Sequence, residues 1–154
     1  MAIYLCAVAT DAPENYEIGL KSRTWGVTSQ YRKRIEGVMK GDTLVFLVGG
    51  RFRSIHRVES DPFEDRRLLW PPLENGDPYP FRIRLSEPEF QGDVRARDLA
   101  QHISMFQKFP SNWGLAVQGP KGIFSPGLSE ADLELIKARM AAVAPGARRL
   151  VQPL

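Results

Sequence analysis

Two tryptophan–glycine corners are the stretches of this sequence best suited to chemistry. The first is Trp25-Gly26, followed by Val27 and by two hydroxyls, Thr28 and Ser29, and the second is Trp113-Gly114, preceded by Asn112. An aromatic ring can stack on a flat base while small polar groups hydrogen-bond to its edge. Two such corners brought together would form a pocket for a flipped-out nucleobase. The alternative is that both tryptophans are core residues, since tryptophan is usually well buried.

A helix is predicted over residues 30–39, directly after the first corner. Ser29 is a suitable N-cap residue, and the free backbone N–H groups at a helix start favour anions. Arg32, Lys33 and Arg34 lie near that start, where cations oppose the helix dipole unless an anion lies between them. We therefore expect these three residues, with Arg51 and Arg53 further along, to contact phosphates. The alternative is an ordinary solvated face.

The remaining chain predicts short strands interrupted by helices. Hydrophobic patterning and turn residues place the strands at 3–8, 43–48, 52–60, 81–85 and 115–117, with helical segments at 14–20, 97–106 and from Ser129 to a stop at Pro145-Gly146. Gly49-Gly50 suits a tight hairpin turn, and 61–80 is predicted to be a long loop. This order favours an α+β fold with a small curved sheet or barrel.

Composition describes one ordinary globular domain, predicted at 1–143 with a C-terminal tail at 144–154. The 154 residues include 21 Lys and Arg against 18 Asp and Glu, a net charge of +3, which permits DNA or RNA as a partner without requiring it. No charged and apolar leader or membrane-length apolar run is evident, so we expect a cytoplasmic protein without a membrane partner.

Catalytic and cofactor motifs are not evident in the sequence. Phosphate-binding loops, nucleophile elbows and clustered carboxylates are missing, and Cys6 is the only cysteine, which excludes an internal disulfide and a cysteine-based zinc site. We expect Cys6 to be a small core residue. The sequence therefore predicts binding rather than catalysis, with no cofactor and no metal.

Five segments in register give the chain a family resemblance. They are 25–27 (WGV), 40–46 (KGDTLVF), 57–62 (RVESDP), 79–83 (YPFRI) and 112–114 (NWG). The sequence resembles the EVE domain, a member of the PUA-like superfamily related to the YTH readers of methylated adenine. The resemblance implies a pseudo-barrel of about five or six mainly antiparallel strands wrapped by helices.

The resemblance also implies a role for Trp25, which corresponds to the first tryptophan of the YTH aromatic cage. The strand expected to supply the second cage tryptophan is Phe81 to Leu85, which contains no tryptophan. Methylated cytosine and methylated adenine therefore both remain candidate ligands. We infer from position that Trp113 supplies the opposing wall. Besides DNA or RNA, a nuclease or a helicase is a candidate protein partner. The rival functions are a sensor of a small nucleotide-like metabolite and, less favoured, a hydrolase of modified nucleotides.

Overall fold

The computed structural model describes residues 1–9, 12–109 and 112–151 of the chain. Its strands are β1 (Ile3–Val8), β2 (Thr24–Val27), β3 (Thr43–Val48), β4 (Arg51–Arg57), β5 (Phe63–Glu64), β6 (Phe81–Arg84) and β7 (Phe90–Arg95). The α-helices are α1 (Glu14–Ser22), α2 (Arg32–Ile35) and α3 (Glu130–Val151), and the 3₁₀ helices are η1 (Ser29–Tyr31), η2 (Ala96–Asp98), η3 (Ser104–Lys108), η4 (Trp113–Val117) and η5 (Gly119–Gly122).

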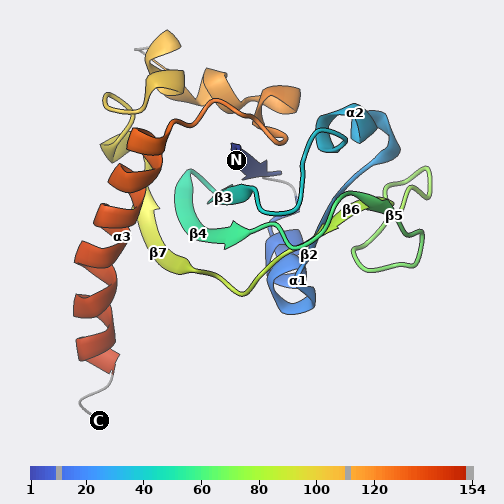
Figure 1. The fold of residues 1–154 in the computed structure, drawn as a ribbon, viewed down its shortest axis with the longest axis horizontal. Helices are drawn as coiled ribbons and strands as arrows, with labels where there is room; N and C mark the ends of the chain where they lie inside the picture. Colours follow the sequence, from blue (N-terminus) through green and yellow to red (C-terminus); the bar gives the residue numbers. More distant parts are fainter. Residues whose placement is uncertain (10–11, 110–111, 152–154) are drawn as a thin grey trace.

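The strands form two sheets that together make a curved, open barrel (Figure 1). The first has the order β1-β3-β4-β7 and the second β2-β6-β5. β1 pairs with β3 in parallel, while the other named pairs are antiparallel. A bridge between Val58 and Leu85 joins the sheets where β4 leads towards β5. The α+β class is confirmed, and the described strands do not close a barrel.

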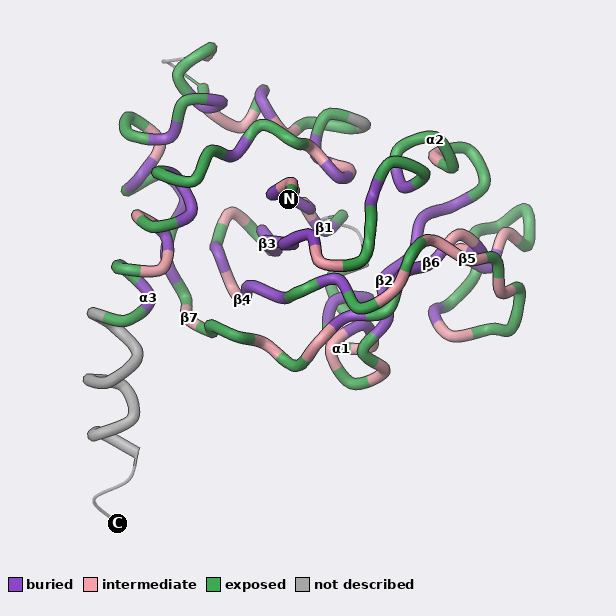
Figure 2. The backbone as a smooth tube through the Cα atoms, in the orientation of Figure 1, coloured by how far each residue is buried: buried purple, intermediate pink, exposed green. Residues whose placement is uncertain are grey.

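Alternation along the central strands explains why the sheet has a core on each face. On β3, Val45 and Leu47 belong to one buried cluster. Leu44 and Phe46 belong to the other. Figure 2 shows the buried backbone of β3 and β4 lying between exposed outer segments. An apolar run this regular needs cover on both sides, and the two clusters provide it.

The outer edge of β1 is sealed by a residue from late in the chain. The Leu5 N–H donates to the Ser125 carbonyl at 2.7 Å, and the Ser125 N–H donates to the Leu5 carbonyl at 2.9 Å. This isolated antiparallel bridge lies on the side of β1 away from β3. The first strand is therefore paired on both of its edges.

Several local predictions are confirmed. Gly49 and Gly50 have φ of +58° and +75°, which is the left-handed backbone that a two-residue hairpin turn needs. Ser129 and Asp132 exchange hydrogen bonds of 3.1 and 2.9 Å as a capping box at the start of α3. Cys6 lies in the core, where burial raises the pKa of its thiol to about 12.

Other local predictions are wrong, and hydrogen bonding is the reason. The helix expected at 30–39 is replaced by η1 and by a short α2 that ends at Ile35. Residues 24–27, expected only as the lead-in to that helix, pair with β6 as strand β2. Residues 90–95, for which no element was expected, pair with β4 as β7. The strand expected at 115–117 is part of η4, while the helix expected at 97–106 is replaced by η2 and η3 with a turn between them. Short apolar runs do not distinguish these states until their partners are known.

The last helix is longer than the sequence predicts. α3 continues through Pro145-Gly146 to Val151, because a helix can continue past a proline at the cost of a backbone hydrogen bond. The domain boundary placed at 143 remains a prediction. Among the helices of the described residues, none is both long and apolar enough to cross a membrane.

Candidate nucleobase-binding site

Trp25 lies at the centre of a group of aromatic side chains on one face of the main sheet. Its ring meets Phe46 and Trp70 edge-on, with centroid distances of 4.9 and 5.8 Å. Two glycines make this packing possible, because a Cβ at Gly19 would lie 2.7 Å from the Trp25 ring and one at Gly26 would lie 3.0 Å from the Trp70 ring. Trp25 keeps 8% of its surface exposed.

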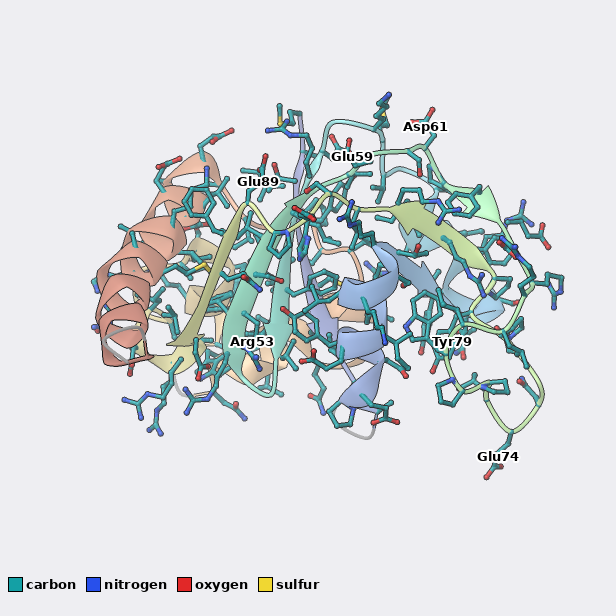
Figure 3. The ribbon with its side chains drawn as sticks, turned by 90° about the horizontal axis from the view of Figure 1, so that it is seen from below. Arg53, Glu59, Asp61, Glu74, Tyr79 and Glu89 are labelled. Carbon is teal, nitrogen blue, oxygen red and sulfur yellow. The ribbon has the colours of Figure 1, made fainter. Side chains whose placement is uncertain are left out.

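Trp70 comes from the loop between β5 and β6 and closes over Trp25. Its indole N–H donates to the Asn15 carbonyl at 3.1 Å, which fixes the loop to α1. Tyr79 packs on its other side at 5.8 Å, and Figure 3 shows Tyr79 beside α1 with Glu74 at the outer tip of the same loop. We call Tyr16, Trp25, Phe46, Trp70 and Tyr79 the aromatic cluster. Both tryptophans of the aromatic cluster, Trp25 and Trp70, are buried within the protein.

Two buried polar atoms on the segments that carry Tyr16 and Trp25 have no hydrogen-bond partner among the described residues. They are Asn15 Oδ1 and Thr28 Oγ1, and both residues are 7% exposed. Asn15 lies one helical turn before Gly19 on the buried face of α1, and Thr28 follows the end of β2. A buried polar atom without a partner costs about 1–3 kcal/mol. In a native structure such an atom is normally satisfied by a protein group, a bound water, an ion or a ligand.

A chain of buried hydrogen bonds holds α1 against β4. The His56 Nδ1 lies 2.9 Å from the Ser86 carbonyl, which only accepts, so Nδ1 carries the proton. The neutral Nε2 then accepts from Ser54 Oγ at 2.8 Å, and Ser54 Oγ accepts from the Tyr16 hydroxyl at 2.7 Å. Because Tyr16 adjoins Asn15, this chain fixes the helix that carries one of the unpartnered atoms.

The protonation of His56 predicts a specific pH dependence of stability. Burial lowers the pKa of His56 below 6.5, although the Ser86 carbonyl and the Glu89 charge partly oppose this. Between the lowered pKa and 6.5 the unfolded chain binds more protons, so stability falls as the pH drops through this window. We expect wild type to lose up to about 1.4 kcal/mol per pH unit there, and His56→Gln to lack that loss. Urea unfolding at pH 7.5 and 5.5 checks this, and equal losses would contradict it.

The structure places Ser29 differently from its predicted capping role. Ser29 is exposed and lies inside η1, whose preceding residue Thr28 makes no side-chain capping bond. The Ser29 N–H instead donates to the Asp77 carboxylate at 3.0 Å. Burial favours the neutral form of Asp77, but hydrogen bonds from Ser29 and Tyr79 outweigh it and lower the pKa of that carboxyl. The expected anion site at this helix start already holds a side chain of the protein.

The five cations predicted to bind phosphate form two groups. Arg32, Lys33 and Arg34 lie with Ser29 around a hollow of about 500 Å³. Arg51 is paired with Asp93 at 3.3 Å on the β4–β7 edge. Arg53, also on β4, lies over the Tyr16 ring at 5.7 Å. The first group therefore lines a concave surface, although Arg32 is also engaged, paired with Glu36 and lying over the Phe81 ring.

Trp113 and Asn112 do not join Trp25. Trp113 packs on Phe106, with the ring centroids 5.1 Å apart, and belongs to the cluster on the opposite face of the sheet. Asn112 is exposed beside it. The sheet separates the two corners, so Trp113 does not form the wall that faces Trp25. Gly26 and Val27 remain beside Trp25, where both are buried.

Comparison with known proteins identifies the fold. No family model matches the chain. The UPF0310 protein of Pyrococcus abyssi is 26% identical over 129 residues, covering 77% of this chain and 87% of the relative. The YTH domain of Toxoplasma CPSF4 superposes with a TM-score of 0.60 at 13% identity, over 92% of this chain and 88% of that domain in its apo form. The chain has a YTH-like fold. The same domain in complex with a 7-mer m6A-modified RNA gives a TM-score of 0.60 at 13% identity, with 91% and 90% covered.

Sequence reasoning missed two residues of the site. Asn15 was not selected because a single asparagine in the first turn of a helix is an ordinary helix-start residue. Trp70 lies in the segment 61–80, which was predicted only as a long loop, and its contact with Trp25 depends on the path of residues 65–80. Among the described residues, no three His, Cys, Asp or Glu side chains gather as a set of metal ligands.

Proposed function

We propose that this YTH-like domain is a non-catalytic EVE-type module that binds a modified nucleobase in DNA or RNA. The base would lie against Trp25, with Asn15 and Thr28 reading its edge. The observation behind this proposal is a pair of buried atoms without partners, Asn15 Oδ1 and Thr28 Oγ1. Asn15 adjoins Tyr16 in the chain and Thr28 lies three residues after Trp25, so both belong to segments that carry the aromatic cluster. A flat ring beside unsatisfied polar groups is the arrangement that a base-binding pocket requires.

The polar atoms favour particular bases. Asn15 Oδ1 only accepts hydrogen bonds, whereas a threonine hydroxyl both donates and accepts. Adenine and cytosine each present an amino donor beside a ring-nitrogen acceptor, which complements these two groups. A methyl group on such a base would then contact the apolar faces of Trp25 and Trp70. The proposal therefore covers methylated adenine and methylated cytosine.

Access to Trp25 requires movement of the loop that bears Trp70. Trp70 is 2% exposed and packs directly on Trp25, so a base reaches Trp25 only when that contact opens. Stacking contributes about 1–3 kcal/mol per base, and two satisfied buried atoms would relieve a cost of similar size. Together these gains can offset the opening of one aromatic contact and one hydrogen bond.

A binding titration tests the proposal. Short single- and double-stranded oligonucleotides would carry unmodified, methylcytosine, hydroxymethylcytosine or methyladenine bases, at two salt concentrations. We expect one modified base to bind at least tenfold more tightly than its unmodified parent. Uniform binding across the panel would overturn the proposal. Affinity for a free modified nucleotide that ignores salt and flanking sequence would instead favour a metabolite sensor.

The choice of variant decides whether this test is interpretable. Trp25→Ala would remove a buried ring at a cost of about 3–5 kcal/mol, so loss of binding could reflect loss of the fold. Trp25→Phe keeps an aromatic ring in the cluster and is the better probe. We expect it to weaken binding of the preferred base while circular dichroism remains that of wild type. Unchanged affinity in this variant would remove Trp25 from the site.

A further inference from the structure

Three hollows on the molecule are joined by shared aromatic residues. One of about 740 Å³ includes Arg97, Gln101, Asn112 and Trp113 in its lining. A second of about 650 Å³ is lined by Trp113, the Gly49-Gly50 turn and Tyr31. Tyr31 also lines the hollow of about 500 Å³ beside Arg32, Lys33 and Arg34. Trp113 therefore borders the first and second hollows and Tyr31 borders the second and third, and we call the three hollows together the long groove.

The long groove follows one side of the fold. Figure 1 shows the segment between β7 and α3 running along the top of the view towards α2. Its first hollow lies against η2 to η4, and its last lies against η1 and α2. A path made by elements so far apart in sequence suits an extended ligand better than a compact one.

The charge of the long groove differs from that of the whole chain. Its described lining includes four cationic side chains, Arg32, Lys33, Arg34 and Arg97, and one acidic one, Glu36. The chain as a whole has 21 cations against 18 acids. Glu36 is already paired with Arg32 at 3.0 Å. The cations lie at the two ends of the groove, and the middle hollow is lined by neutral residues.

The two linking rings are suited to stacking. Trp113 is half-buried, backed by Phe106 at 5.1 Å, and borders two hollows. Tyr31 is half-buried as well, and its N–H donates to the Thr28 carbonyl at 2.9 Å. This bond places one end of the long groove beside the residue proposed to read the base edge.

We propose that the long groove binds the single strand that flanks the modified base. Unpaired bases stack on Tyr31 and Trp113, while Arg32 to Arg34 and Arg97 attract the phosphates at either end. A duplex cannot use the two rings in this way, because its bases are already stacked on one another. The proposal rests on the proposed function for taking nucleic acid as the ligand. It assigns to Trp113 a role separate from the pocket at Trp25.

Fluorescence anisotropy with labelled 12-mer oligonucleotides tests the groove. The full chain is compared with Trp113→Leu, Arg97→Gln and, as a charge-matched control, Arg139→Gln on the exposed side of α3. We expect Trp113→Leu to weaken single-strand binding about fivefold or more with an unchanged salt slope. Arg97→Gln should reduce the salt slope by about one, and Arg139→Gln should change neither quantity. Arg97 is exposed, so its replacement should leave the fold intact. This variant therefore still tests the groove if Trp113→Leu proves unstable.

The outcomes separate the groove from the base pocket. If Trp113→Leu and Arg97→Gln bind single strands as wild type does, the groove proposal is wrong even where modified bases are still preferred. If both variants weaken binding of unmodified and modified strands alike, the groove is supported. This holds whether or not the preference for a modified base changes. Tighter binding of duplex than of single strands would overturn it. So would failure to bind any oligonucleotide, which would point to a protein partner.

Discussion

Replacing Arg82 with alanine is expected to lower the free energy of unfolding markedly, because each buried carbonyl left without its donor costs about 1–3 kcal/mol. The Arg82 side chain is only 3% exposed and lies 3.6 Å from the Asp65 carboxylate. Its Nε donates to the Tyr79 carbonyl at 2.9 Å and its Nη2 to the Pro78 carbonyl at 3.1 Å. The two carbonyls would lose this donor together, whereas Asp65 would keep its hydrogen bonds from Arg67.

The same substitution should loosen the loop that covers Trp25. Arg82 lies over the Trp70 ring at 5.3 Å and donates to the Arg67 carbonyl, so it binds both ends of the segment 65–80. We expect faster proteolysis within this segment, together with the lower stability in urea. Arg84→Ala is the control, because Arg84 is exposed on the same strand and its loss should cost less than about 1 kcal/mol. Equal stability of the two variants would contradict this account of Arg82.

Replacing Thr28 with valine is expected to stabilise the free protein while weakening recognition of the base. The buried Oγ1 has no partner, so its removal relieves a penalty of about 1–3 kcal/mol. In the complex we propose, the same hydroxyl bonds the base, and its loss should reduce affinity for the preferred base about tenfold. Thermal unfolding and the oligonucleotide titration measure the two effects on one sample.

A threonine on β2, the strand that precedes Thr28, provides the matched control. Thr24 is also buried, but its hydroxyl donates to the Ser22 carbonyl at 3.0 Å and accepts from Arg84 at 3.2 Å. Thr24→Val should therefore destabilise the protein by about 1 kcal/mol and leave base preference unchanged. Opposite signs at Thr24 and Thr28 would identify Thr28 Oγ1 as an atom kept for a ligand. Destabilisation by Thr28→Val would contradict this.

Local patterns in the sequence predicted the elements whose chemistry is local. The apolar run at 43–48, the glycine pair at 49–50 and the cap at Ser129 each depend on neighbouring residues, and each is confirmed. The pairing of residues 24–27 with β6 depends on a strand nearly sixty residues later. For that reason the stretch expected only to precede a helix is a strand.

The composition of the site could be predicted only in part, for the same reason. Trp25 was selected from its neighbours, and the structure places it in the aromatic cluster against Phe46 and Trp70. Asn15 and Trp70 are brought there by α1 and by a long loop, which no local pattern positions. Trp113 looked equivalent to Trp25 because the sequences around them are similar, yet the alternation of β3 puts them on opposite faces.

The pairing of Leu5 with Ser125 has a consequence for how the chain reaches its native state. These residues are 120 positions apart. The ribosome therefore synthesises β1 early, and the backbone groups on its second edge stay unpaired until Ser125 has been added. Contacts of such long range slow folding, because loop closure precedes the gain from pairing. Until Ser125 arrives, β1 exposes the kind of unpaired edge that recruits other chains. A nascent chain halted before residue 125 should therefore depend on chaperones far more than the finished protein does.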